Sequence, residues 1–195
     1  MELVYPPYQA PDIPGISIDN PFPDREGSEE YLPAVDEAGL VIGRTTRRYV
    51  HSGSKLLHPV VHLHILDREG RIYLQKRSMA KDLLPGYWDT AVGGHVGYGE
   101  YIMEALFREA SEELGMAEFN PVYLKSYVYE SASERELVNV FACVGAYSPA
   151  PDGDEVADGK FWTFREIEKV LHKSVLTPNF ESEFASVRDM LTSLL

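Results

Sequence analysis

Residues 94–100, Gly-His-Val-Gly-Tyr-Gly-Glu, and residues 108–116, Arg-Glu-Ala-Ser-Glu-Glu-Leu-Gly-Met, decide the fold of this chain. The first stretch reads as a glycine-rich loop, and the second as the end of a helix that stops at Gly115. Glu109, Glu112 and Glu113 are spaced i, i+3 and i+4, so they share one helix face and repel one another. Magnesium (Mg²⁺) or manganese (Mn²⁺) relieves such repulsion, because both ions prefer carboxylate oxygens.

An apolar stripe lies beside these glutamates on the same helix, which predicts that they border a packed surface. The stripe consists of Met103, Leu106, Phe107, Ala110 and Leu114. A second interpretation stays open at this point. Glu104, Arg108 and Glu112 are spaced four apart, so they could form an ordinary ladder of charges on a solvated face.

The spacing of this region resembles the Nudix signature at Gly94, Glu100, Arg108, Glu109, Glu112, Glu113 and Gly115. The resemblance implies a metal-dependent hydrolase that cleaves a diphosphate linked to another moiety. It implies that the metal is held by Gly94, Glu109, Glu112 and Glu113. In this family the glutamate matching Glu100 commonly pairs with the arginine matching Arg108, which holds the loop on the helix.

The chemistry of diphosphate hydrolysis needs such a cluster. A phosphoanhydride carries negative charge that repels water, so metal ions must neutralise its oxygens and lower the pKa of a bound water. A glycine-rich loop lets backbone groups approach metal and phosphate closely. A general base is also needed, and its identity depends on geometry. Our candidates for catalysis are Glu109, Glu113 and Glu136.

Length, charge and cysteine content limit the class of protein. The 195 residues, 44% of them hydrophobic, are enough for one domain with a proper core. A formal net charge of −13 disfavours binding to nucleic acid or anionic membranes. The single Cys143, the lack of a long apolar run and the lack of a signal pattern predict a cytoplasmic protein. We expect a small-molecule diphosphate as its partner and leave a homodimer open.

The chain divides into a Pro-rich N-terminal extension at 1–30 and a Nudix domain at 31–195. The many aromatic residues of the extension favour an extended arm over a flexible tail. Short strands are expected around a turn at 36–39, and longer ones at 60–66, 71–76, 122–130, 137–146 and 160–164. Helices are expected at 165–171 and 179–195. This order predicts an α/β (α+β) fold with a mixed sheet between helices, as the Nudix resemblance also implies.

Other segments are similar to the isopentenyl-diphosphate isomerase branch of the Nudix superfamily. They are His51, His58, residues 74–88, the Gly94-His95 pair and residues 134–136. The resemblance implies a metal surrounded by His51, His58, His95, Glu134 and Glu136, and a substrate diphosphate contacted by Arg77 and Lys81. Manganese or zinc suits such a ligand set. Alternatively, His58 merely starts a strand and His95 only hydrogen-bonds across the loop.

Two differences from that branch favour hydrolysis. The isomerases carry a catalytic cysteine directly before the Gly-His pair, where this chain has Gly93. Cys143 lies in an apolar strand and is expected to be a buried core residue. The chain also keeps every acidic position of the signature. We therefore predict a pyrophosphohydrolase, with an isomerase that uses another proton donor, or a noncatalytic sensor of a diphosphate metabolite, as alternatives.

Roles for the remaining side chains follow from their position. Glu134 and Glu136 are two residues apart on a strand, so they point the same way. Glu136 is the favoured base. Alternatively, both are ordinary charges on an edge strand. Arg77 and Lys81 would clamp phosphate. Trp88, with Tyr87 and Trp162, either walls the pocket or packs in the core. His62 and His64 share one strand face, and a structural role is favoured for both.

Overall fold

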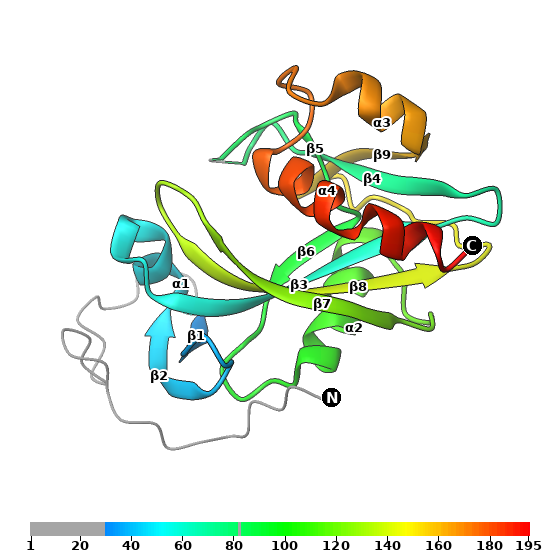
Figure 1. Cartoon of the computed structure of the whole chain (residues 1–195). Coiled ribbons are helices and arrows are strands. Elements are labelled where there is room, and N and C mark those ends of the chain that lie inside the picture. The colour runs from blue at the N-terminus through cyan, green and yellow to red at the C-terminus, as the bar shows by residue number, and fades with distance from the viewer. Residues whose placement is uncertain (1–29, 82) are drawn as a thin grey trace. The chain divides into compact units, whose positions relative to one another are not determined.

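The computed structural model describes residues 30–81 and 83–195 (Figure 1). The predicted N-terminal extension lies outside these residues, apart from Glu30. The described chain falls into two compact units, which we describe separately. The first contains 30–61, 94–105 and 126–139, and the second contains 62–81, 83–93, 106–125 and 140–195.

The first unit begins with an antiparallel hairpin of β1 (Tyr31–Val35) and β2 (Val41–Thr46). The Asp36 carboxylate accepts hydrogen bonds at 2.9 Å from the backbone N–H groups of Ala38 and Leu40, which fixes the predicted turn. A short helix, α1 (Arg47–Tyr49), and a π-helical turn, η1 (Val50–Ser54), follow. His51, the first histidine of the chain, lies in η1.

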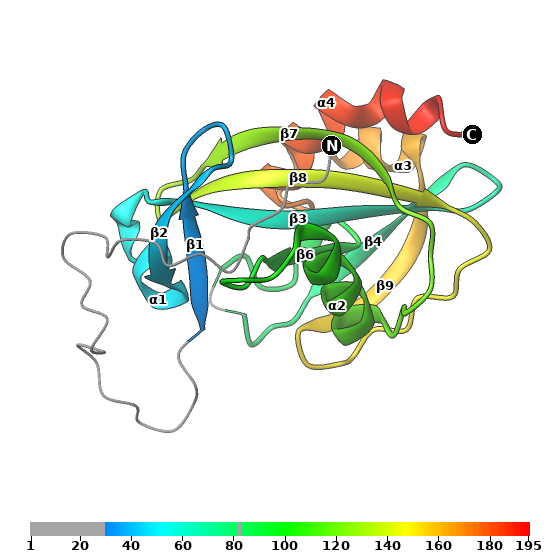
Figure 2. The same cartoon turned by 90° about the horizontal axis from the view of Figure 1, so that it is seen from below.

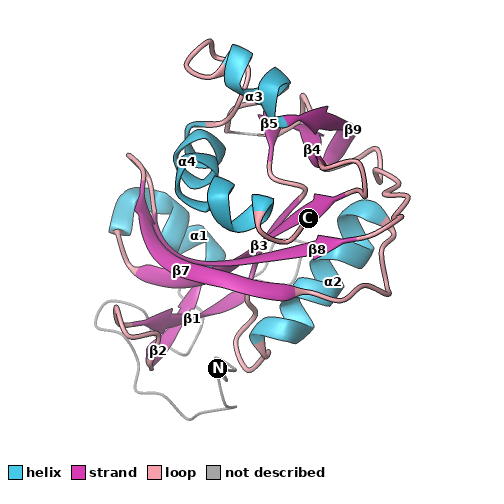
Figure 3. Cartoon of the chain, turned by 45° about the vertical axis from the view of Figure 1, so that its right-hand side comes forward, coloured by secondary structure: helices cyan, strands magenta, loops and turns pink. Residues whose placement is uncertain are grey.

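Several elements run from one unit into the other along the chain. They are β3 (Leu57–Leu66), β6 (Val92–His95), α2 (Ile102–Leu114), β7 (Val122–Glu130) and β8 (Arg135–Val144). The second unit also holds β4 (Arg71–Arg77), β5 (Trp88–Asp89), β9 (Val156–Thr163), α3 (Phe164–Val170) and α4 (Pro178–Thr192). Within the described residues, seven strands pair in the order β5-β4-β3-β8-β7, with β6 beside β3 and β9 beside β4. The α+β class is as predicted (Figure 3).

The strand register assigns the helices of the second unit to opposite sheet faces. Gln75 of β4 hydrogen-bonds Glu113 of α2, which places α2 on the face of Gln75. Ile72 lies on the other face, because side chains alternate along a strand. Leu66 pairs with Ile72, so Leu66 and the alternate residues of β3 also face away from α2. Figure 2 shows α4 on that side and α2 on the other.

Strand β9 is longer than the sequence indicated. We predicted a strand at 160–164, whereas β9 begins at Val156. The reason is its pairing with β4, which extends from Arg71 opposite Thr163 to Arg77 opposite Val156. The following helices begin as predicted, with a Thr163–Glu166 capping box before α3 and Thr177 capping α4. No described helix is long and apolar enough to span a membrane.

Substituting Gly159 by alanine should destabilise the fold. A Cβ at this position would lie 1.8 Å from the hydroxyl oxygen of Tyr73, whose side chain is buried. The buried Tyr73 ring or the two strands must therefore shift, and overpacking of this kind costs about 1–3 kcal/mol. Urea unfolding measures the loss, and Ala157→Ser, at an exposed site on the same strand, is the control. An unchanged free energy of unfolding would contradict the packing described.

Candidate active site and histidine cluster

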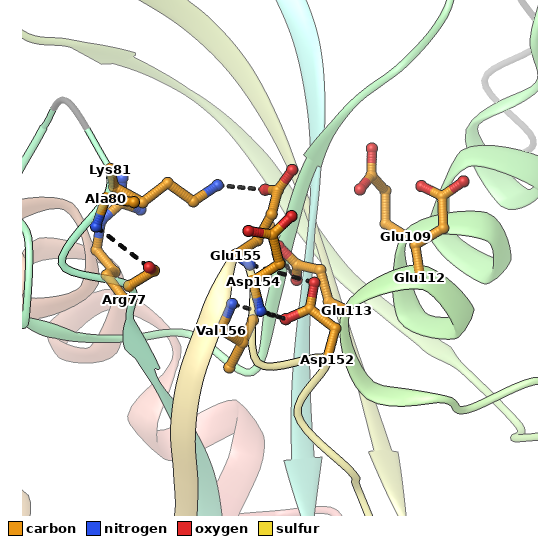
Figure 4. A network of polar contacts seen from close by, with 12 residues as sticks. Arg77, Ala80, Lys81, Glu109, Glu112, Glu113, Asp152, Asp154, Glu155 and Val156 are labelled. Atoms are coloured by element: carbon orange, nitrogen blue, oxygen red, sulfur yellow. Dashed lines mark hydrogen bonds and ion pairs between the residues drawn. The ribbon is translucent and has the colours of Figure 1, made fainter.

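The three signature glutamates lie on the α2 segment of the second unit (Figure 4). Glu113 is buried, with 6% of its surface exposed. One of its oxygens, Oε2, accepts hydrogen bonds of 3.3 Å from the Gln75 side-chain amide and from the Gly93 backbone N–H. Strand β4 and strand β6 thus fix this carboxylate in place.

Burial and neighbouring charge make the Glu113 carboxylate unstable on its own. Desolvation is the main reason, followed by repulsion from Glu109, and together they raise the pKa of Glu113 to about 8. The hydrogen bond from Gly93 acts in the opposite direction and does not offset them. A carboxylate in this position gains from a nearby divalent cation, so these residues fit the magnesium or manganese ion that the signature implies.

Arg108 already neutralises part of the cluster. Its Nη1 atom lies 2.8 Å from a Glu109 oxygen and 3.1 Å from a Glu112 oxygen. The ordinary i, i+4 ion pair that we considered is therefore present. Among the described residues, the three box carboxylates do not come together within 4.8 Å of one another. A metal ion at this site would compete with Arg108 for Glu109 and Glu112.

A loop of the second unit, residues 152–155, contains further acidic residues that our sequence analysis did not name. Lys81 forms an ion pair with Glu155, and Figure 4 shows this contact together with Asp152 and Asp154. The Asp152 backbone N–H donates to the Glu113 carbonyl at 3.0 Å, which attaches the loop to the end of α2. The acidic residues among positions 152–155 were the available signal, but the sequence analysis assigned them no role.

Arg77 and Lys81, the predicted phosphate contacts, belong to the same unit as the box glutamates. The Arg77 guanidinium donates to the Leu83 carbonyl at 3.1 Å and lies 3.2 Å from an Asp89 carboxylate oxygen. Asp89 also accepts a 2.7 Å hydrogen bond from the Thr177 hydroxyl. The guanidinium is thus held in a fixed orientation, with a quarter of its side chain exposed.

Trp88 lies on the other side of the sheet from Gln75 and Glu113. Trp88 pairs with Lys76, while its neighbour Asp89 pairs with Gln75, so alternation directs Trp88 away from the Gln75 face. There it packs edge-to-face on Trp162 at 5.2 Å between ring centroids. This contact fits the packing role, one of the two alternatives that we weighed for Trp88.

The histidine cluster lies in the first unit and combines His51, His58, His95, Glu134 and Glu136. The Nε2 atoms of His51 and His95 are 3.0 Å apart, and His51 Nδ1 lies 2.6 Å from Glu134. His58 is fully buried and donates from Nδ1 to the Leu56 carbonyl at 3.1 Å. Its Nε2 atom is therefore an acceptor, and within the described part of the chain it has no hydrogen-bond partner.

These groups fit a transition metal. Potential ligand atoms of His51, His58 and His95 lie within 4.8 Å of one another, as do those of His58, Glu134 and Glu136. Burial lowers the pKa of His58 to about 4, so its imidazole is neutral at physiological pH, the form that binds metal. An unpartnered buried nitrogen in this form suits zinc or manganese.

The remaining predicted residues divide between the two units. Gly94 and Glu100 belong to the first, where Glu100 accepts a 2.8 Å hydrogen bond from the Gly97 N–H and so closes the glycine loop. Glu136 also lies in the first unit, with the histidines, whereas the other two catalytic candidates lie in the second. Cys143 is fully buried, which raises its thiol pKa to about 12 and makes it a core residue, as expected.

Comparisons with known proteins point to the same family as the signature in the sequence. The NUDIX domain profile matches residues 56–180. The isopentenyl-diphosphate Delta-isomerase 1 of Photorhabdus laumondii is 28% identical over 81% of this chain and 94% of its own length. A protein of Streptomyces coelicolor named as an uncharacterized Nudix hydrolase is 32% identical, covering 83% of this chain and 90% of its own. Among solved structures, DR0079 from Deinococcus radiodurans matches with a TM-score of 0.70 at 22% identity, over 80% of this chain and 98% of its own, which supports the fold.

Proposed function

The chain belongs to the Nudix family, and we propose that it is a hydrolase that cleaves a diphosphate linkage in a nucleoside diphosphate derivative or related organic diphosphate. Water attacks at phosphorus, with magnesium or manganese as cofactor. The observation that carries this proposal is the complete set of box carboxylates on one segment of α2, with Glu113 buried and held by Gln75 and Gly93.

The cysteine content supports hydrolysis over thiol-dependent chemistry. Glycine occupies position 93, where the isomerases carry their catalytic cysteine, and the chain's single cysteine, Cys143, is buried with a raised thiol pKa. A buried thiol of this kind is inert. The full acidic box, by contrast, supplies the hard oxygen ligands that hydrolysis of a diphosphate needs.

The predicted metal ligands and phosphate contacts of the second unit each have a role in this proposal. Glu109, Glu112 and Glu113 would hold the metal, which supplies charge neutralisation of the phosphate oxygens and an acidified water. Lys81 would exchange Glu155 for a substrate phosphate, and Arg77, oriented by Asp89, would bind another phosphate oxygen. The net charge of −13 makes this local basic pair necessary for any anionic substrate.

A substrate screen tests the proposal. The protein is incubated with nucleoside, sugar, coenzyme and prenyl diphosphates in the presence of magnesium or manganese, and the products are identified by mass. We expect at least one diphosphate to be split into two products when metal is present and none to be split after chelation. A panel that stays intact under both conditions would contradict the proposal.

An isomerase is the second candidate, because the first unit brings together all five residues of the histidine cluster. Incubation with isopentenyl diphosphate in heavy water separates the two activities. Deuterated allylic product without phosphate release would establish isomerisation and overturn the hydrolase. We expect no allylic product, since the known proton donor of the isomerases is replaced by Gly93.

Removal of a histidine should weaken metal binding at the histidine cluster independently of the box. For His51→Ala we expect the zinc dissociation constant, measured by competition with a chromophoric chelator, to rise at least about tenfold. Glu112→Gln, at a box position on the second unit, is the matched control and should leave it unchanged. Equal zinc binding by wild type and His51→Ala would show that the cluster is only a hydrogen-bonded network.

A further inference from the structure

The carboxylate of Asp89 connects Arg77 to the start of α4. Its Oδ2 atom lies 3.2 Å from Arg77 Nη1, and its Oδ1 atom accepts hydrogen bonds of 2.7 Å from the Thr177 hydroxyl and 2.9 Å from the Thr90 backbone N–H. All four residues belong to the second unit. Both oxygens of Asp89 therefore have donors, and the position of this carboxylate depends on Thr177 as well as on Arg77.

The Thr177 hydroxyl has a fixed direction. Thr177 is the N-cap of α4 and is 2% exposed, and its hydroxyl oxygen accepts a 3.2 Å hydrogen bond from the Phe180 backbone N–H. A hydroxyl has a single proton, and the cap leaves that proton for Asp89. The first turn of α4 thus sets the direction in which Thr177 donates.

The backbone before α4 lies along β5 and holds Thr177 beside Asp89. The Trp88 N–H donates to the Val175 carbonyl and the Thr177 N–H donates to the Trp88 carbonyl, both at 2.9 Å. Leu176 forms a parallel bridge with Trp88, so these two residues share a face and Thr177 projects to the opposite one. Asp89 follows Trp88 along β5, so it projects to the same face as Thr177.

Asp89 and the Leu83 carbonyl together orient the Arg77 guanidinium. Nη1 is directed to Asp89, and Nε donates to the Leu83 carbonyl at 3.1 Å. A guanidinium has more N–H groups than these two contacts use, and the fork of remaining donors matches the geometry of a phosphate. An arginine that is already held in one orientation loses less side-chain entropy when it binds an anion.

We propose that Thr177 is a positioning residue of the substrate site, whose hydroxyl holds Asp89 where Asp89 orients Arg77 toward a substrate phosphate. This inference rests on the proposed function, in which Arg77 binds a phosphate oxygen. It extends that function to the start of α4, 88 residues from Asp89 in the sequence. Thr177 acts through Arg77 and takes no part in the attack on phosphorus, so its loss should weaken binding rather than slow the chemical step.

Thr177→Val tests this role, because it removes the hydroxyl and keeps the shape of the side chain. Binding of inorganic pyrophosphate in the presence of magnesium is measured by calorimetry. We expect the dissociation constant to rise about threefold to tenfold, as for the loss of preorganisation of one long side chain. Thr177→Ser keeps the hydroxyl and should restore binding. With a substrate found in the screen, KM should rise in Thr177→Val while kcat stays within about twofold.

A second substitution at Arg77 shows whether Thr177 acts through it. Arg77→Ala alone should raise the dissociation constant about tenfold or more, as for the loss of a charge-assisted hydrogen bond. Thr177→Val should have no further effect in that background, because residues that act through one contact are not additive. Thr163→Val is the matched control for the loss of a helix cap. It removes the hydroxyl that caps α3 at Glu166 and should leave pyrophosphate binding unchanged.

Equal pyrophosphate binding by wild type and Thr177→Val, or the same loss in the presence and absence of Arg77, would overturn the inference. A loss matched by Thr163→Val, or a wild type that binds no pyrophosphate, would overturn it as well. If Thr177→Val does not fold, Asp89→Asn tests the same connection, since it removes the charge that faces Arg77 and should weaken binding at least as much. Failure of the hydrolase proposal would be seen separately, as a substrate panel that stays intact although pyrophosphate binds.

Discussion

Glu113→Gln should lower kcat for diphosphate hydrolysis at least about 100-fold, the scale on which a preorganised charge in an active site is measured. The amide keeps the size of the side chain and can still accept the hydrogen bonds of Gln75 and Gly93. It removes the negative charge that the metal requires. Steady-state assays at saturating magnesium, with the substrate from the screen, measure the loss.

Glu118→Gln is the matched control for this substitution. Glu118 is exposed and follows the end of α2, so the same change of charge there should leave kcat within about twofold. Equal activity of Glu113→Gln and the wild type would contradict the role given to the box. If Glu113→Gln abolishes release of product for every active substrate, the alternative of a noncatalytic sensor is rejected.

Glu183→Gln should lower the free energy of unfolding by about 3 kcal/mol, because it removes a buried carboxylate of α4 whose oxygens lie within hydrogen-bond distance of His62 and His64. For a chain of this length each kcal/mol corresponds to about 2–4 °C in Tm, so we expect a decrease of about 6–12 °C at neutral pH. Thermal unfolding followed by circular dichroism measures it. Glu181→Gln, on the same helix, is the control. A change below about 1 kcal/mol would contradict a stabilising role for the contacts of Glu183 with the two histidines.

The difference in unfolding free energy between wild type and Glu183→Gln should change with pH in a defined direction. The pKa of Glu183 is lower in the folded protein than its reference value of 4.5, so the carboxylate binds fewer protons when folded. Its contribution is fully present above pH 4.5 and decreases as the pH falls toward the folded value. The gap in stability between wild type and Glu183→Gln should therefore narrow below pH 4.5.

The box could be predicted from sequence because its chemistry is local. The spacing of Glu109, Glu112 and Glu113 sets their shared helix face without any knowledge of the rest of the fold. The same local logic predicted the alternative, a salt bridge from Arg108 to Glu112, and the structure contains it. Spacing alone cannot decide between a metal ion and an arginine as the partner of a carboxylate, since both are cations that neutralise its negative charge.

The long-range features could not be read from spacing. The histidine cluster joins positions from 51 to 136, and only the family resemblance indicated that they meet. Glu183 is separated by more than 100 residues from His62 and His64, so their shared strand face predicted burial but no partner. The side of the sheet on which Trp88 lies depends on its register with Lys76, which the sequence does not specify.

Hydrolysis of the best substrate of the screen in water enriched in oxygen-18 tests the central claim most directly. If water attacks at phosphorus, one of the phosphate-bearing products carries a single oxygen-18 atom, and its formation requires magnesium or manganese. We expect this label, and we expect it to disappear in Glu113→Gln. Product whose phosphate contains no oxygen-18, or deuterated allylic product from isopentenyl diphosphate with no hydrolysis of any substrate, would contradict the account.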